Sequence, residues 1–162
     1  MGAEKRQGGE SERAANSALV RDFGLLIKAA TRLELRIDAA LRQRCGISHT
    51  MFEVLIRLCR QEGEGVSQRQ LADDLTLTSS GITRLIDRME ETGLVRRVPS
   101  PTDRRSVLVE PADRGRTAFV DAAAVHAEVV ERYFVEPLSR ADYTRLTAAL
   151  GRIDEALDDT GQ

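Results

Sequence analysis

The chain has 162 residues, of which 41% are hydrophobic, 31% are charged and 4% are aromatic, with no Trp. This length suits one compact domain or two small lobes and excludes a large multidomain enzyme, while the few aromatic residues disfavour a β-sandwich or a stacking platform for single-stranded nucleic acid. The formal net charge is -2, so a wholly basic surface is excluded and any anionic partner must meet a local basic patch.

The sequence lacks the signals of membrane, secreted and metal-binding proteins. No apolar run approaches the roughly 18 residues that a membrane span needs, and the first sixteen residues have no apolar signal-peptide core. Cys45 and Cys59 are too few and too oddly spaced for a disulfide framework or a CxxC site, and neither pairs with His49 or His126 at a metal-binding spacing. We therefore expect a cytoplasmic protein with reduced thiols, no metal and no cofactor.

The N-terminal part of the chain predicts an unstructured arm followed by one long helix. Residues 1–16 show no apolar periodicity and are expected to be disordered. A helix ending at Cys45-Gly46 would be roughly 40 Å long, which is more than a small domain can cover from its own side. This favours a second chain over folding of the apolar stripe onto its own chain. The stripe comprises Leu19, Phe23, Leu26, Ile27, Ala30, Leu33, Ile37 and Leu41.

Three shorter helices are predicted next. Ser48 is a candidate N-cap for a helix that ends by Gly65. Residues 67–70 match a capping box that starts a helix of about two turns, and Thr78 can cap the following helix, which Gly93 ends. The predicted buried stripe of that last helix is Ile82, Leu85, Ile86 and Met89.

The rest of the chain predicts a small hairpin and two helices. Residues 94–98 and 106–109 have the composition of strands and flank a loop rich in Pro, Asp and Arg. A helix then runs from beyond Pro111 to Pro137, and Ser139 can cap a final helix. The apolar stripe of this final helix is Leu146, Leu150, Ile153 and Leu157. The predicted order is ααααββαα, a mostly α protein with a small β-hairpin.

The succession of helix, turn, helix and hairpin within residues 48–110 is typical of a winged helix-turn-helix, whose second helix enters the major groove of DNA. On the second helix, Arg84 has the planar fork that pairs with guanine. The alternative is an ordinary solvated face, on which acidic residues only position other groups. The residues expected to face outward are Ser80, Thr83, Arg84, Asp87, Arg88 and Glu91.

The predicted hairpin is the most basic segment of the chain. Between residues 95 and 109, four arginines oppose one aspartate and give a net charge of +3 in a chain that is negative overall. Such an excess favours contact with DNA phosphates or with a narrow minor groove, whereas the alternative is a charged, solubilising loop. The charged residues are Arg96, Arg97, Asp103, Arg104 and Arg105.

Residues 67–116 resemble the DNA-binding core of the MarR family of bacterial transcription regulators. The most specific segments are ITRLIDRMEETGLVRR, which resembles the family's recognition helix and Gly turn, and DRRSVLVEPADRGR, which resembles its wing and the next helix start. With the flanking helices, the resemblance covers residues 18–158. At Pro111-Ala112 the family usually has a Leu-Thr pair, so we expect Asp113 to replace that Thr as the cap.

The resemblance implies a transcription regulator, such as a repressor, that binds an inverted repeat in double-stranded DNA as an intertwined homodimer. The first, fifth and sixth helices of two chains would interlock in that dimer, so the resemblance implies that residues 17–47 and 111–158 form a helical dimerisation region. Together with the outward helix face and the hairpin, the expected DNA-binding residues are Ser67, Gln68, Thr78, Ser79, Ser80, Thr83, Arg84, Arg88, Arg97, Asp103, Arg104 and Arg105.

The resemblance also implies release from DNA by a small phenolic or anionic ligand that lodges between the dimer helices and the winged unit. The alternative for His49 is an exposed residue at a helix start. A thiol switch at Cys45, beside Arg42 and Arg44, is the rival sensing mode, whereas Cys59 is expected to be inert core. The candidate ligand-binding residues are Leu33, Arg36, His49, Met51, Phe52 and Leu55.

Two other classes of function fit the sequence less well. An enzyme would need a nucleophile and a base, but there is no GxSxG, HExxH, P-loop or dinucleotide motif, and His126 lies among apolar residues that favour packing. A protein-interaction module with the same fold would favour a neutral hairpin, whereas this one is basic. We therefore expect a DNA-binding regulator and not an enzyme.

Overall fold

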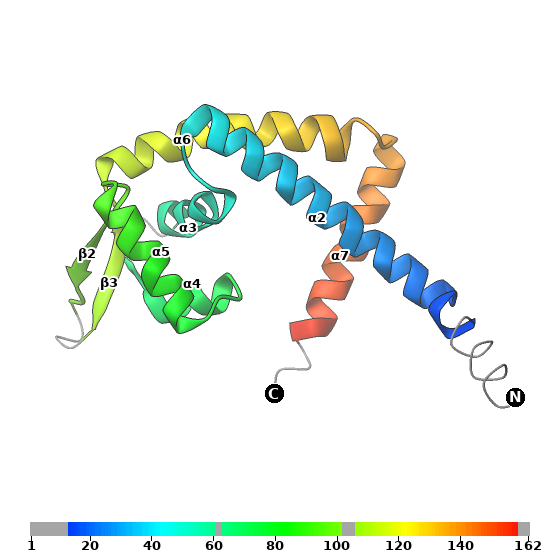
Figure 1. Ribbon diagram of the computed structural model, residues 1–162, viewed down its shortest axis with the longest axis horizontal. Helices are drawn as coiled ribbons and strands as arrows, with labels where there is room; N and C mark the ends of the chain where they lie inside the picture. The colour runs from blue at the N-terminus through cyan, green and yellow to red at the C-terminus, as the bar shows by residue number, and fades with distance from the viewer. Residues whose placement is uncertain (1–12, 61–62, 102–105, 159–162) are drawn as a thin grey trace, which may run out of the picture. The chain divides into compact units, whose positions relative to one another are not determined.

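The computed structural model describes residues 13–60, 63–101 and 106–158 (Figure 1). It divides into two compact units between Arg36 and Ile37. The first contains the N-terminal part of helix α2, and the second contains the end of α2, the helices α3 to α7 and a small sheet. None of the helices in the described ranges combines the length and the apolar composition that crossing a membrane requires.

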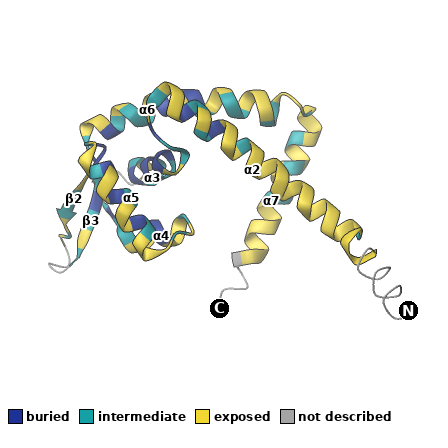
Figure 2. Ribbon diagram, viewed as in Figure 1, coloured by how far each residue is buried: buried dark blue, intermediate teal, exposed yellow. Residues whose placement is uncertain are grey.

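Helix α2 (Ala18–Cys45) is the long helix that the apolar periodicity predicts. Its first part is solvent-exposed along nearly its whole length (Figure 2), and Phe23 keeps 65% of its surface accessible. Further along, Ile37 and Leu41 are buried in the core of the second unit. Residues 13–15 are also helical, so regular structure begins earlier than the predicted arm boundary at residue 16. Residues 1–12 of the predicted arm lie outside the described residues.

Three helices begin at the polar caps that the sequence predicts. They are α3 (His49–Arg60), α4 (Gln68–Asp74) and α5 (Ser79–Glu91). The hydroxyl oxygens of Ser48, Ser67 and Thr78 accept hydrogen bonds from backbone N–H groups three residues ahead, at 3.2, 3.1 and 3.1 Å. Because the first N–H groups of a helix have no partner within it, each cap fixes where its helix starts.

The predicted hairpin is part of a three-stranded antiparallel sheet. Its strands are β2 (Val95–Pro99) and β3 (Val107–Pro111), and β3 also pairs with the two-residue strand β1 (Val66–Ser67), giving the order β1-β3-β2. Val109 lies opposite Val66 on one side and Arg97 on the other. Strand β1 was not predicted because two residues show no alternation. It ties the start of α4 to the hairpin.

The C-terminal helices differ in detail from the prediction. They are α6 (Asp113–Val130), a π-helical segment η1 (Glu131–Val135) and α7 (Arg140–Asp158), so the helix predicted to reach Pro137 changes its winding before its end. The expectation that Asp113 caps α6 is wrong, because the N-cap is Ala112, which has no side-chain acceptor. Its N–H donates to the carbonyl oxygen of Leu94 at 3.0 Å.

The core of the second unit lies among α3, α5 and the sheet. Its fully buried side chains include those of Leu55, Leu58, Ile86, Met89 and Val109. Glycine is required where α6 meets this core, since a Cβ at Gly115 would lie 1.9 Å from the carbonyl oxygen of Leu94. The predicted stripe of α5 is buried except for Leu85, which is half-buried. This packing leaves the opposite face of α5 in solvent.

Candidate nucleic-acid interface

The outward face of α5 presents polar and basic side chains from a helix anchored by its buried face. Ile82 and Ile86 are at most 2% exposed, whereas Arg84 and Arg88 are exposed. Within the described ranges, neither guanidinium has an ion-pair partner. A rigid helix that offers unpaired arginines can bring them to phosphates or base edges without first breaking an internal salt bridge.

The hydroxyl groups at the start of α5 are oriented by local hydrogen bonds. Thr83 Oγ1 donates to the carbonyl oxygen of Ser79 at 2.8 Å, which leaves its oxygen lone pairs as acceptors. The oxygen of Thr78 caps the helix and lies 3.4 Å from the Ser80 Oγ. Because Ser79 and Ser80 are exposed beside the first turn, their hydroxyls and the free N–H groups there suit a phosphate oxygen.

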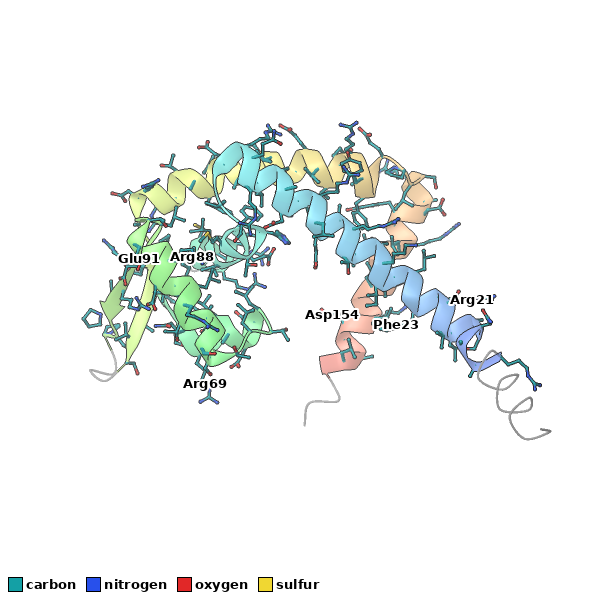
Figure 3. All side chains as sticks on the ribbon, viewed as in Figure 1. Arg21, Phe23, Arg69, Arg88, Glu91 and Asp154 are labelled. Atoms are coloured by element: carbon teal, nitrogen blue, oxygen red, sulfur yellow. The ribbon has the colours of Figure 1, made fainter. Side chains whose placement is uncertain are left out.

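The start of α4 carries a basic residue that is not among the predicted DNA-binding residues. Ser67 and Gln68 are half-buried at this helix start, and Ser67 is occupied as a cap and as a strand residue. The next residue, Arg69, is exposed and extends away from the helix (Figure 3). In a helix-turn-helix the first helix crosses the DNA backbone, so Arg69 is the better placed of these residues for a phosphate.

Arg97, one of the predicted DNA-binding residues, is engaged inside the protein. Its guanidinium donates to Asp87 Oδ1 at 2.5 Å and also to the Glu90 carboxylate, and its backbone N–H donates to Glu90 Oε1 at 3.0 Å. The Asp87 carboxylate, together with Glu90, raises the pKa of Arg97. Both acids lie on α5, so this clamp holds strand β2 against that helix. It favours a positioning role for Arg97 over a DNA contact.

The neighbouring Arg96 is also matched by an acid, since its Nη2 lies 2.8 Å from Glu110 Oε2 on the facing strand. Two of the four arginines behind the predicted +3 charge therefore have carboxylate partners in or beside the sheet. The excess of positive charge in the hairpin then depends on its loop. The predicted contacts Asp103, Arg104 and Arg105 lie there, outside the described residues.

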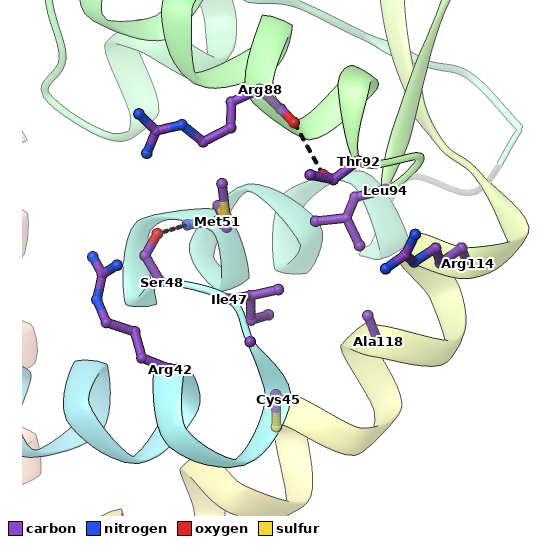
Figure 4. Close-up of a pocket in the computed structure, with 11 residues that line it drawn as sticks. Arg42, Cys45, Ile47, Ser48, Met51, Arg88, Thr92, Leu94, Arg114 and Ala118 are labelled. Carbon is purple, nitrogen blue, oxygen red and sulfur yellow. Dashed lines mark hydrogen bonds between the residues drawn. The ribbon is translucent and has the colours of Figure 1, made fainter.

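The six predicted ligand-binding residues differ in how deeply they are buried. Phe52 and Leu55 are buried in the core, at 3% and 0% exposure, and Met51 lines a cavity of about 340 Å³ beside α3 (Figure 4). His49 is half-buried. Leu33 and Arg36 belong to the first unit, in which Leu33 is half-buried and Arg36 is exposed.

His126 packs against the aromatic core, as the sequence predicts. Its ring lies 5.0 Å from that of Phe52 and 6.1 Å from that of His49, measured between centroids. Burial lowers the pKa of His126, and the neighbouring His49 lowers it further. Cys45 and Cys59 are both half-buried, so the prediction that Cys59 lies in the core is only partly met. Among the described residues, no cluster of three or more His, Cys, Asp or Glu side chains could hold a metal.

Known proteins with related sequences or folds are regulators of transcription. A model of the MarR family matches residues 47–107. The HTH-type transcriptional regulator PecS of Dickeya dadantii is 33% identical over 137 residues, which cover 82% of each chain.

Solved structures agree with these sequence matches. The MarR family regulator Sco3205 from Streptomyces coelicolor, in complex with DNA, has a TM-score of 0.78 and 25% identity over 87% of this chain and 92% of its own. CouR from Rhodococcus jostii RHA1, bound to p-coumaroyl-CoA, has a TM-score of 0.73 and 33% identity over 85% and 95%.

Proposed function

This chain belongs to the MarR family of transcriptional regulators, and we propose that it is a cytoplasmic repressor that binds an inverted repeat in double-stranded DNA as a homodimer. A small organic ligand releases it from the DNA. The single observation that carries DNA binding is the outward face of α5, where Arg84 and Arg88 stand exposed and unpaired among the described residues. The complex of Sco3205 with DNA supports this proposal.

Each part of the winged unit has its own role in the proposed complex. Arg84 reads a guanine through a bidentate contact in the major groove, with Ser80 and Thr83 beside it. Arg88, Arg69 and the hydroxyl groups at the start of α5 bind phosphates and set the position of the helix. In the hairpin loop, Arg104 and Arg105 reach the minor groove, as their sequence indicates.

The apolar stripe of α2 supports the homodimer. Leu19, Phe23 and Ile27 are 84%, 65% and 50% exposed, and with their neighbours they line a shallow apolar groove. On α7, Ile153 and Leu157 are also at least half exposed. Contiguous exposed side chains of this kind mark an interaction surface, and a twofold dimer would place two copies of α5 about 34–36 Å apart for successive major grooves.

Control by a small ligand is the second part of the proposal. The structure of CouR with p-coumaroyl-CoA supports it for this fold. A ligand can release DNA only if it binds the DNA-free conformation more tightly than the DNA-bound one. The ligand must therefore bind at a place where it changes the position or the availability of residues that contact DNA.

Titration of the full chain against its operator tests the DNA-binding proposal. The operator is first selected from the duplex DNA that flanks the coding region of the protein. Arg84→Ala should then cost about 1–3 kcal/mol on this operator and almost nothing on duplexes already changed at the guanine that Arg84 reads. Arg140→Ala, an exposed arginine at the start of α7, serves as the control and should bind as the wild type does. Failure to bind any of the flanking DNA would refute the proposal.

A further inference from the structure

The turn between α4 and α5 contains a residue in a strained backbone conformation. Thr76 has a φ of 53°, and among the described residues it is the one non-glycine residue with a positive φ. Left-handed backbone favours glycine, and a β-branched side chain is a genuine outlier there. Such strain persists only where surrounding contacts hold it, and it clusters where a function needs the conformation. The contacts that hold this turn therefore bear on how the two helices bind DNA.

Thr76 closes the end of α4 through two backbone hydrogen bonds. The N–H of Leu77 donates to the carbonyl oxygen of Ala72 at 2.8 Å, and the N–H of Thr76 donates to that of Asp73 at 3.2 Å. This pair of bonds is a Schellman motif, in which the left-handed position is usually glycine. Neither bond reaches the carbonyl oxygen of Asp74, the last residue of α4.

Arg57 on α3 supplies a partner for that carbonyl. Its Nη2 donates to the oxygen of Asp74 at 3.2 Å, and its Nη1 donates to the carbonyl oxygen and to Oε2 of Glu53, at 2.9 and 2.6 Å. A planar guanidinium with one arm fixed on its own helix holds an acceptor at the other arm in a set direction. Arg57 therefore ties the end of α4 to α3.

The turn also sets where α5 begins. Thr78, two residues after Thr76, is the N-cap of α5, and the exposed Ser79 and Ser80 follow directly. In the proposed complex with DNA, the hydroxyl groups at this helix start bind phosphates. If Thr76 relaxed to an ordinary φ, the chain just ahead of α5 would rotate, and these hydroxyl groups would be displaced from the DNA backbone.

We propose that Arg57 is a positioning residue for DNA binding, which holds Thr76 in its left-handed conformation and so places the first turn of α5 on the DNA backbone. Arg57 acts through the turn and does not touch DNA itself. The contact is needed because Thr76 is strained, and with glycine at this position the turn would keep its shape without Arg57. This inference rests on the proposed function, because it names what holds the DNA-binding helix in place.

Titration of full-length variants against the operator tests the role of Arg57. Arg57→Met, which keeps much of the length of the side chain and removes its donors, should weaken DNA binding about tenfold, the scale of residues that act through another element. Adding Thr76→Gly to this variant should restore most of the lost affinity, because a glycine turn needs no support. Thermal melts should show both variants folded, so that unfolding does not account for the loss.

Three further variants separate this role from simpler ones. Arg60→Met removes an exposed arginine from the same helix and should leave DNA affinity unchanged. Thr76→Val keeps the branched side chain and removes the hydroxyl group, and it should bind as the wild type does, since Thr76 is not proposed to contact DNA. Arg57→Lys keeps the charge but has one nitrogen in place of the fork, so it should lose part of the affinity.

Amide hydrogen exchange of the DNA-free protein tests the turn separately from DNA binding. The N–H of Leu77 is protected by its bond to Ala72, which closes the turn only while Thr76 stays left-handed. Exchange at this amide should be about tenfold faster in Arg57→Met and slower in Thr76→Gly than in the wild type. Because no operator is needed, this result is distinguishable from failure of the DNA-binding proposal.

Three results would overturn the proposal. They are a folded Arg57→Met that binds the operator as the wild type does, a loss of affinity that Thr76→Gly does not reduce, and exchange at Leu77 that neither substitution changes. If Arg57→Met does not fold, the same comparison is made with Arg57→Lys, with and without Thr76→Gly. A loss that is absent in Arg57→Lys, or that Thr76→Gly does not reduce, would then overturn it.

Discussion

The winged part of the chain and the first part of α2 differ in how far their apolar side chains are exposed to solvent. Between residues 47 and 111, the apolar side chains of α3, α5 and the sheet cover one another, and many are fully buried. Between residues 18 and 36, all side chains are exposed except that of Leu33, which is half-buried. The first region is stabilised by contacts within its own chain. The second region carries apolar side chains that have no such contacts. The difference indicates that the winged part folds by itself and that the first part of α2 needs a partner chain.

The largest effect is expected from a substitution in the buried core of the winged part. Ile86 is fully buried in α5, and Ile86→Ala should lower the free energy of unfolding by about 2–5 kcal/mol through lost packing and a cavity. Val120 on α6 is 66% exposed, and Val120→Ala should change stability by less than about 0.5 kcal/mol. Urea unfolding measures both variants, and equal losses would mean that α5 is not packed as described.

A charge in the exposed apolar stripe of α2 should weaken dimerisation without unfolding the chain. Phe23→Asp places a carboxylate in the apolar stripe of α2 and should weaken dimerisation by about 2–4 kcal/mol, the scale of a central interface residue. Sedimentation velocity at micromolar concentration should show the wild type as a dimer and this variant as a monomer.

A matched control sharpens this test. Leu35 is as exposed as Phe23, at 64% against 65%, but lies outside the stripe. Leu35→Asp should therefore remain dimeric, and a wild-type chain that sediments as a monomer would refute the interpretation of α2.

A smaller effect is expected where strand β2 is clamped to α5. Arg97→Gln removes the contact of the guanidinium with Asp87 and Glu90 and leaves two carboxylates close together, which should cost about 1–2 kcal/mol of stability. The salt bridge of Arg96 with Glu110 is the comparison, because the Arg96 side chain is 63% exposed against 25% for Arg97. Arg96→Gln should cost less than about 1 kcal/mol. Urea unfolding that ranks the two variants in reverse order would contradict the clamp.

The smallest effect is a dependence of stability on pH through His126. Its pKa is lowered by burial, so the unfolded chain takes up a proton before the folded chain does. Stability should therefore fall as the pH drops below about 6.5, the unperturbed value for histidine. His126→Gln should reduce this loss between pH 7.5 and 5.5 in urea unfolding. An unchanged loss would assign it to groups other than His126.

Local chemistry is what made most of the fold predictable. The caps at Ser48, Ser67 and Thr78 and the stripe of α5 depend on residues within one or two turns, and the structure confirms them. The clamp on Arg97 was not predictable, because its acids lie seven and ten residues away on another element. A basic residue has the same sequence signal whether it faces DNA or a carboxylate.

The cavity beside α3 was not predicted, for the same reason. Arg42, Arg88 and Arg114 come from three helices that are far apart in the chain, and only the fold places them around one cavity. No spacing rule joins them, whereas the long apolar stripe of α2 was visible because it repeats along a single helix.

Hydroxyl-radical footprinting of the full chain on its operator tests most directly the claim that two winged units act together. The account predicts two protected patches on one face of the duplex, with centres about 10 base pairs apart, each due to one copy of α5. Phe23→Asp should lose both patches at concentrations where the wild type protects both. A single patch, or two patches that survive in this variant, would contradict the account.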